Sequence, residues 1–216
     1  MLKQLKPAIL SVLVITIVVG FVFPFVITGI GQLAFHRQAN GSLITKDGKV
    51  IGSEIIGQNF SEPGYFHPRP SAAGSGYDAA NSGGANLGPT SDKLINGIHK
   101  KLPDGKDDPG SYDGIKDLAA AYRNENGLPP NAEVPADAVT RSASGLDPHI
   151  SPANAKLQAA RVARARGLSV AAMRRLVGQS IEPRTLGFLG EPRVNVLGLN
   201  LKLDILAGKT ARNGHR

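Results

Sequence analysis

The sequence predicts an α+β protein in which a single N-terminal transmembrane helix is followed by one small exported α+β domain. Three observations support this: a long uncharged apolar segment at the N-terminus, short alternating apolar segments typical of strands, and helical segments with cap and stop residues. The chain has 216 residues and 22.6 kDa, enough for one anchor and one modest domain. It has no cysteine, which excludes disulfides, thiolate metal sites and a cysteine nucleophile.

Residues 7–35 carry no charge and are long enough to cross a bilayer, which needs about 20 apolar residues. The two lysines that precede the segment place residues 1–6 in the cytoplasm and residues 36–216 in the periplasm or outside the cell. A cleaved signal peptide has a shorter apolar core, about 7–15 residues, so we interpret the segment as a retained single-pass anchor of the cytoplasmic membrane. Pro24 is expected to kink the helix, because it lacks a backbone donor.

The exported domain is expected to begin with a hairpin. Residues 43–45 and 50–51 flank Lys46-Asp47-Gly48-Lys49, where Asp-Gly supplies the positive φ angles of a tight turn. Ile55 and Ile56 predict a further short strand. Residues 60–90 have a linker-like glycine and proline content, yet they hold four of the seven aromatic residues outside the anchor. Because such side chains are usually buried, we expect an ordered, irregular segment packed on the domain.

Helices follow, and their boundaries are set by cap and stop residues. The clearest has Ser151 as cap, Pro152 at the first helical position and Gly167 as a left-handed stop. The expected helices are residues 92–102, 115–125 and 152–166 and a short one after Ser169. The chain is expected to close with strands over residues 194–203, where apolar and polar residues alternate with one slip of phase that a β-bulge would absorb.

The formal net charge of +8 lies in the last third of the chain. Residues 1–140 carry 12 Lys or Arg against 13 Asp or Glu, and residues 141–216 carry 13 against 4. This region is either a solvated face or a docking surface for acidic side chains or lipid headgroups, with Arg161, Arg164 and Arg193 among the candidate contacts. Nucleic acid is excluded as a partner, because the domain is predicted to lie outside the cytoplasm.

A glycine-rich string imitates a phosphate-binding loop. Gly83, Gly88 and Thr90 match the spacing of G-x-x-x-x-G-K-[ST], and the string opens a helix. Pro89 replaces the lysine and brings neither charge nor a backbone donor. We therefore expect a turn that caps a helix, with nucleotide binding as the alternative.

A second cluster holds the side-chain types of a serine hydrolase, namely Ser142 or Ser144 with Asp147 and His149. Neither serine has the G-x-S-x-G surroundings, so a turn-rich segment whose polar side chains satisfy backbone groups is the favoured interpretation. A membrane-anchored exported serine hydrolase is the alternative. The five histidines include no pair at i,i+2 or i,i+4, so no dedicated metal site is expected.

Several strings, in one order behind a single N-terminal span, resemble the C subunit of the bacterial Kdp potassium-transporting P-type ATPase. The strings are GYFHPRPSA at 64–72, SGGANLGPT at 82–90, SGLDPHISPA at 144–153, RVARAR at 161–166 and GEPRVNVL at 190–197. The resemblance covers nearly the whole chain. It departs from the family in a variable, loop-rich insert at 102–133 and in a polar tail at 205–216.

The resemblance implies a non-catalytic accessory subunit of a high-affinity K⁺ uptake complex, in which a channel-like subunit selects K⁺ and a P-type ATPase subunit hydrolyses ATP. Family accounts also describe the C subunit as a catalytic chaperone that raises ATP affinity. Because the domain is predicted outside, we expect assembly and stabilisation, with any effect on ATP indirect. ATP, Mg²⁺ and K⁺ are then handled by the complex, and no motif of this chain binds a cofactor.

The expected partners are the channel-like subunit, the ATPase subunit and membrane lipid. Ordered loops rich in proline and glycine lose little entropy on docking, so the strings supply the candidate contacts. These candidates are Tyr65, Phe66, Arg69, Pro70, Asn86, Asp147, His149, Arg161, Arg164 and Arg193.

Overall fold

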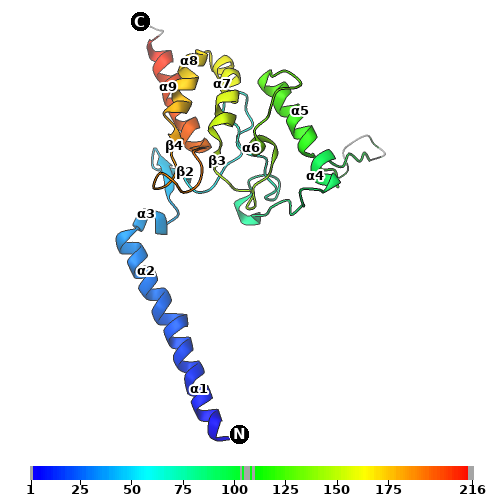
Figure 1. Cartoon of the computed structure of the whole chain (residues 1–216). Coiled ribbons are helices and arrows are strands. Elements are labelled where there is room, and N and C mark those ends of the chain that lie inside the picture. Colours follow the sequence, from blue (N-terminus) through cyan, green and yellow to red (C-terminus); the bar gives the residue numbers. More distant parts are fainter. Residues whose placement is uncertain (1, 103, 105–107, 109, 214–216) are drawn as a thin grey trace. The chain divides into compact units, whose positions relative to one another are not determined.

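The computed structural model describes residues 2–102, 104, 108 and 110–213 of the chain (Figure 1). The chain divides into two compact units, Met1–Ser53 and Glu54–Arg216. The predicted class is confirmed, because one apolar N-terminal helix is followed by a mixed helix and sheet domain. Parts of the predicted loop after residue 102 and the last three residues of the predicted tail lie outside the described residues.

The first unit contains a long helical run and a hairpin. Its elements are α1 (Leu2–Ile17), the π-helical turn η1 (Val18–Val22), α2 (Phe23–Ala34), α3 (His36–Ala39), β1 (Leu43–Lys46) and β2 (Lys49–Ser53). The run Lys3–Ala34 is long and apolar enough to cross a membrane. The Phe23 N–H bonds to the Val18 carbonyl, five residues back, so the helix widens just before Pro24, which has no N–H to donate.

The predicted hairpin is confirmed. Strands β1 and β2 pair antiparallel, and Asp47 and Gly48 at the turn have φ angles of 51° and 76°. The predicted strand at Ile55 and Ile56 is wrong, because Ile55 lies in a turn and Ile56 takes part only in an isolated bridge. The reason is the next residue: the Gly57 N–H bonds to the Leu146 carbonyl at 2.8 Å, and a Cβ on Gly57 would meet backbone of the 146–147 segment.

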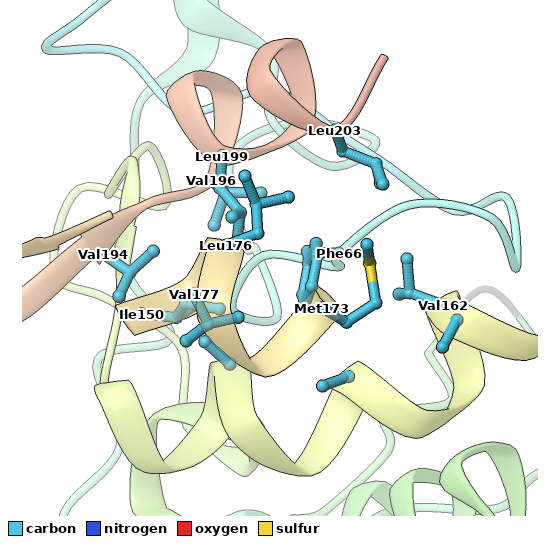
Figure 2. Packing of buried hydrophobic residues seen from close by; sticks show 13 residues of the cluster. Phe66, Ile150, Val162, Met173, Leu176, Val177, Val194, Val196, Leu199 and Leu203 are labelled. Atoms are coloured by element: carbon cyan, nitrogen blue, oxygen red, sulfur yellow. The ribbon is translucent and has the colours of Figure 1, made fainter. Parts of the chain in front are cut away.

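The second unit is built on helices that pack against a small sheet. Its elements are η2 (Ala79–Asn81), α4 (Asp92–Asn96), α5 (Ile115–Asn126), α6 (Ala136–Val139), β3 (His149–Ile150), α7 (Pro152–Arg166), α8 (Val170–Gly178), β4 (Ile181–Glu182), β5 (Arg193–Asn195) and α9 (Val196–Asn213). The sheet is antiparallel with the order β3-β5-β4. Helices α7, α8 and α9 enclose its main core, where Phe66 lies close to Met173 and Val162 (Figure 2).

Local signals placed three of the helices correctly. The Ser151 hydroxyl accepts from the Asn154 N–H at the start of α7, and Gly167 ends the helix in the left-handed conformation. Gly127 ends α5 in the same way, and the Ser169 hydroxyl caps α8. A smaller hydrophobic cluster joins α5, α6 and α7 around Tyr122, Ala138 and Val139.

The helix predicted over residues 92–102 is too long. It begins as expected, with the Ser91 hydroxyl accepting from Leu94, but α4 ends at Asn96. Gly97 has a φ of 80°, and a Cβ on it would lie 2.9 Å from the Gly114 nitrogen. The chain therefore leaves the helix to pair with the 112–114 segment, where Ile98 and Tyr112 form an antiparallel bridge.

The strands predicted over residues 194–203 are wrong beyond Asn195, because α9 begins at Val196. Alternate leucines in this stretch imitate a strand. Val196, Leu199 and Leu203, however, are spaced three and four residues apart, and these side chains are at most 2 % exposed. That spacing places them on one face of a helix.

The start of α9 carries a cap that the sequence reading missed. The Asn195 Oδ1 accepts from the Gly198 N–H at 2.9 Å, so Gly198 lies in the first helical turn and not in a bulge. The helix continues to Asn213, and most of the predicted polar tail is therefore helical.

Candidate functional site

The five strings that resemble a known family all lie in the second unit, and hydrogen bonds join all of them; the 190–197 string, for example, pairs with the 144–153 string through β3 and β5. The 64–72 segment has no regular secondary structure, yet side chains of two helices hold its backbone. Asn200 of α9 donates to the Phe66 carbonyl at 3.0 Å and accepts from the Phe66 N–H at 2.9 Å. Since both Asn200 and the Phe66 side chain are buried, this pair fixes the segment in the core.

Helix α7 holds the same segment through an inward polar face. Asn154, Gln158 and Arg161 lie four and three residues apart on this face, and all three are buried. Gln158 brackets the backbone of His67, accepting from its N–H at 2.7 Å and donating to its carbonyl at 3.0 Å. The irregular 60–90 segment is therefore ordered, as predicted: Phe66 is buried in the main core, Phe60 and Tyr65 pack against it, and polar side chains of α7 and α9 hold the backbone near Phe66.

Arg161 is the centre of this polar interior. Its guanidinium donates to the carbonyls of Pro63 and Tyr65 at 2.7 and 3.0 Å, to the Asn126 side chain at 3.1 Å and to the Gln158 side chain at 2.7 Å. Burial lowers the pKa of Arg161. This arginine, predicted as a surface contact, thus lies in the interior, whereas Arg164 on the same helix is exposed.

A second polar cluster joins α5, α6 and α7. Asp137 accepts from the Ser151 N–H at 2.7 Å, from the Ser151 hydroxyl at 2.9 Å and from the Asn154 amide at 3.0 Å. The Tyr122 hydroxyl donates to Asn154 Oδ1 at 2.9 Å. Burial raises the pKa of Tyr122, so its hydroxyl stays a neutral donor at physiological pH.

Arg69 and Asp147 connect the 64–72 and 144–153 segments. Arg69 Nη1 lies 2.8 Å from Asp147 Oδ2, and Asp147 Oδ1 accepts from the His149 N–H at 3.0 Å. Burial opposes ionisation of Asp147, but its contacts with the His149 ring and backbone and with Arg69 outweigh burial and lower its pKa to about 2. The Tyr77 hydroxyl donates to the Arg69 carbonyl at 2.9 Å, which fixes the backbone at this junction.

The glycine-rich 82–90 segment packs against residues 143–145. The Gly83 N–H and the Ser82 hydroxyl both donate to the Ser144 carbonyl at 2.9 Å. A Cβ on Gly84 would lie 2.8 Å from the Ala143 carbonyl oxygen, so only glycine fits there. These glycines permit a close approach of two backbones, which is a packing role.

The nucleotide-binding candidates have no further support from this geometry. Gly88 and Thr90 are exposed. Asn86 of the same string, a candidate partner contact, is also exposed and has a φ of 51°. The helix that follows has only five residues, and its cap is Ser91. Phosphate loops place several N–H groups around the ligand at the start of a full helix, whereas the Gly83 N–H here is bonded to protein backbone.

The serine hydrolase candidates do not form a triad. His149 Nδ1 lies 3.7 Å from Asp147 Oδ1, and its Nε2 lies 3.8 Å from Glu182 Oε2, so both ring nitrogens face carboxylates. The Ser144 hydroxyl accepts from the Leu146 N–H at 3.1 Å, as in a turn. Within the described part of the chain, no hydrogen bond joins His149 to Ser142 or Ser144.

The fold also brings together groups that are distant in the sequence. His99, Asp113 and Asp117 place one ligand atom each within 4.8 Å of one another, in positions that could hold a metal ion. The Ile98–Tyr112 bridge causes this, and spacing along the chain gave no sign of it. Asp117 Oδ2 already accepts from the Gly114 N–H at 2.8 Å and lies 3.1 Å from His99 Nε2.

The exposed side of the polar interior opens into a cavity of about 330 Å³. His67, Arg69, Tyr77, Glu125 and Gln158 line it together with apolar groups. His67 Nδ1 lies 2.8 Å from a Glu125 oxygen, and this hydrogen bond lowers the pKa of Glu125. The cavity walls therefore include Glu125 and Gln158, the side chains through which α5 and α7 bind His67.

Three of the remaining candidates also have contacts within the domain or partial burial. The Arg166 guanidinium lies over the Tyr65 ring at 4.3 Å and bonds Asp204 at 2.9 Å. Arg193 Nε lies 3.1 Å from Glu182, and Pro70 is half-buried in the cavity wall. Sequence reasoning missed Asn200, Gln158 and Asn154, whose only signal is that they stand among the apolar residues that the helical period places on the buried side of α7 and α9.

The fold and the site describe a protein with one helix suited to span a membrane and a small α+β domain whose motif residues hold one another in place. The chain belongs to the family described as the K⁺-transporting ATPase c chain, whose model matches residues 5–205.

Curated relatives share nearly their whole length with this chain. It is 52% identical to the potassium-transporting ATPase KdpC subunit of Mycobacterium tuberculosis, over 95% of this chain and 100% of the relative. It is 50% identical to the KdpC subunit of Koribacter versatilis, with 94% and 95% covered, and 48% identical to that of Rhodospirillum rubrum, with 94% and 96% covered.

Proposed function

We propose that this chain is a non-catalytic accessory subunit that assembles and stabilises the other subunits of an ATP-driven K⁺ uptake complex. Membership of the K⁺-transporting ATPase family supports a role in potassium transport within a complex. The finer proposal is that a single apolar helix anchors the chain, while the domain docks on the channel-like and ATP-hydrolysing subunits that the family resemblance implies.

The observation that carries this proposal is that the polar side chains in and around the motif strings make their contacts within the domain. Asn200, Gln158 and Arg161 direct their hydrogen bonds to backbone within the domain, and Asp147 is paired with Arg69. A catalytic site needs polar groups aimed at an open position where a substrate binds. A docking module needs a fixed surface, and a backbone held by buried polar side chains provides one.

The proposed orientation places the N-terminus in the cytoplasm and the domain outside. It is supported by the lysines that precede the apolar helix. ATP would then lie on the opposite side of the membrane, and any effect of this chain on ATP affinity passes through its partners. Because the native chain has no cysteine, Gln4→Cys and Thr90→Cys test the orientation directly. An impermeant thiol reagent on cells with a permeable outer layer should modify only the second.

Co-purification tests assembly. The tagged full chain, extracted in mild detergent, should retain a much larger polytopic ATPase. Replacing residues 7–35 by an unrelated transmembrane segment should reduce that retention, because helix packing in the bilayer depends on small residues such as Gly20, Gly29 and Gly31. Wild-type chain that is recovered alone, or unchanged K⁺ uptake at low external K⁺ after deletion of the gene, contradicts the proposal.

A further inference from the structure

The connection between β4 and β5 exposes large apolar side chains. Leu186 is 79% exposed, Phe188 68% and Leu189 48%. We call residues 185–190 the apolar tip. These three large apolar side chains lie within four consecutive residues, and their exposure to water is unfavourable. Such exposed apolar patches usually mark an interaction site.

The apolar tip has a fixed conformation. Thr185 and Leu189 exchange two backbone hydrogen bonds of 2.9 Å, and the Gly187 N–H bonds to the Arg184 carbonyl at 3.1 Å. Leu186 has a φ of 54°, an unfavourable angle for a bulky residue. Strand pairing of β4 with β5 joins the tip to the core sheet. Docking such a preformed turn costs little conformational entropy.

The stem of the apolar tip is electrically neutral. Arg184 pairs with Glu191 at 2.6 Å, and Arg193 pairs with Glu182 at 3.1 Å. Loops that bind anionic headgroups or acidic peptides present unpaired lysine or arginine beside their apolar residues. Here each stem arginine already has a carboxylate, so the charge pattern fits an uncharged apolar surface.

We infer that the apolar tip inserts into an uncharged apolar pocket on the non-cytoplasmic face of a membrane-embedded subunit of the same complex. This inference rests on the proposed function and adds the contact by which the domain docks. A rigid neutral turn fits a pocket of fixed shape in a protein better than the mobile, anionic surface of a bilayer.

A photocrosslinker at the tip tests the inference. p-Benzoylphenylalanine replaces Phe188 in the full chain, expressed with the other subunits, and the purified complex is irradiated in lipid nanodiscs. The expected product is a covalent adduct with a polytopic subunit, mapped by mass spectrometry to a segment outside the cytoplasm. The same probe at the exposed residue Gln179 is the control and should not give this adduct.

Substitution measures how much the contact contributes. The double variant Leu186→Ser, Phe188→Ser should bind the other subunits with roughly 100-fold lower affinity, because each buried apolar side chain contributes about tenfold in affinity. Both side chains are exposed in the chain itself, so the fold should not change; tyrosine fluorescence verifies this. Val170→Ser, at another exposed apolar position, is the matched control and should be retained like wild type.

The outcomes separate the two proposals. Lipid adducts alone at position 188 would assign the tip to the bilayer and overturn the inference. An intact complex with no adduct at 188, or with the double variant retained like wild type, also overturns it and leaves the accessory function standing. Wild-type chain that fails to co-purify with any polytopic subunit overturns both.

Discussion

Replacing Arg161 by leucine should destabilise the domain strongly. Leucine keeps part of the apolar packing but removes donors to two backbone carbonyls and to the side chains of Asn126 and Gln158. Each buried acceptor left without a donor costs about 1–3 kcal/mol, although water can reach some of them. We therefore expect a loss of about 3–4 kcal/mol, out of the roughly 5–15 kcal/mol that stabilises a typical domain.

Urea unfolding of the full chain in detergent micelles measures this loss. The chain has no tryptophan, and its four tyrosines all lie in the second unit, so tyrosine fluorescence reports on the domain. With a urea dependence of about 2 kcal/mol per M, the midpoint should fall by about 1.5–2 M.

Arg164→Leu is the matched control for this experiment. It is the same substitution one turn further along α7, at an exposed position, and should change stability by less than about 0.5 kcal/mol. If the two variants unfold at the same urea concentration, the buried role assigned to Arg161 is refuted.

Asn200→Ala should lower the unfolding free energy by about 2 kcal/mol, because both backbone groups of Phe66 lose their partner; a urea midpoint equal to that of wild type contradicts this. Asp147, whose pKa is lowered to about 2, should contribute about 2 kcal/mol that is fully present above about pH 4–5 and lost as the pH falls through 2. Asp147→Asn should therefore lose less unfolding free energy than wild type as the pH falls over this range. If the unfolding free energies of the two proteins fall in parallel with pH, the carboxylate is not responsible. Gly145→Ala should destabilise more than Gly127→Ala, since both glycines have a positive φ but only Gly145 would place its Cβ 2.7 Å from neighbouring backbone. Equal urea midpoints for the two glycine variants would remove the close-packing argument.

The parts of the fold that the sequence predicted correctly depend on local signals. Asp47-Gly48 fixes its hairpin by the φ angles it permits, and Ser151 with Gly167 marks both ends of α7. These residues act within four positions along the chain, so no tertiary contact is needed to recognise them.

Helix α9 was misread because its sequence satisfies two periodicities. The leucines at every second position fit a strand, and Val196, Leu199 and Leu203 fit a helix. Asn200 misled the strand reading further, because a buried polar residue on the core side looks like a solvent position. Only the Phe66 backbone, which is distant in the sequence, explains why an asparagine lies there.

The strings of the candidate site could be predicted from the sequence, but the helix side chains that hold them and the arrangement of their residues could not. Strings 64–72 and 144–153 stand out in the sequence, but many of the contacts that hold them run from side chains to backbone groups, as in Ser71 with Gly145 and Gln158 with His67. Every residue has the same backbone groups, so such contacts have little sequence signature. For this reason Arg161 looked like a surface charge before the carbonyls around it were known.

Contacts within the domain leave less unpaired positive charge on the surface than the composition suggests. Of the arginines in the last third, Arg161 lies in the interior and Arg166 pairs with Asp204. Arg184 and Arg193 pair with glutamates beside the apolar tip. An excess of positive charge counted along the chain therefore overstates the charge available to a partner. The surface that stands out for docking is a neutral, apolar one, which fits a permanent neighbour in a complex better than a transient electrostatic partner.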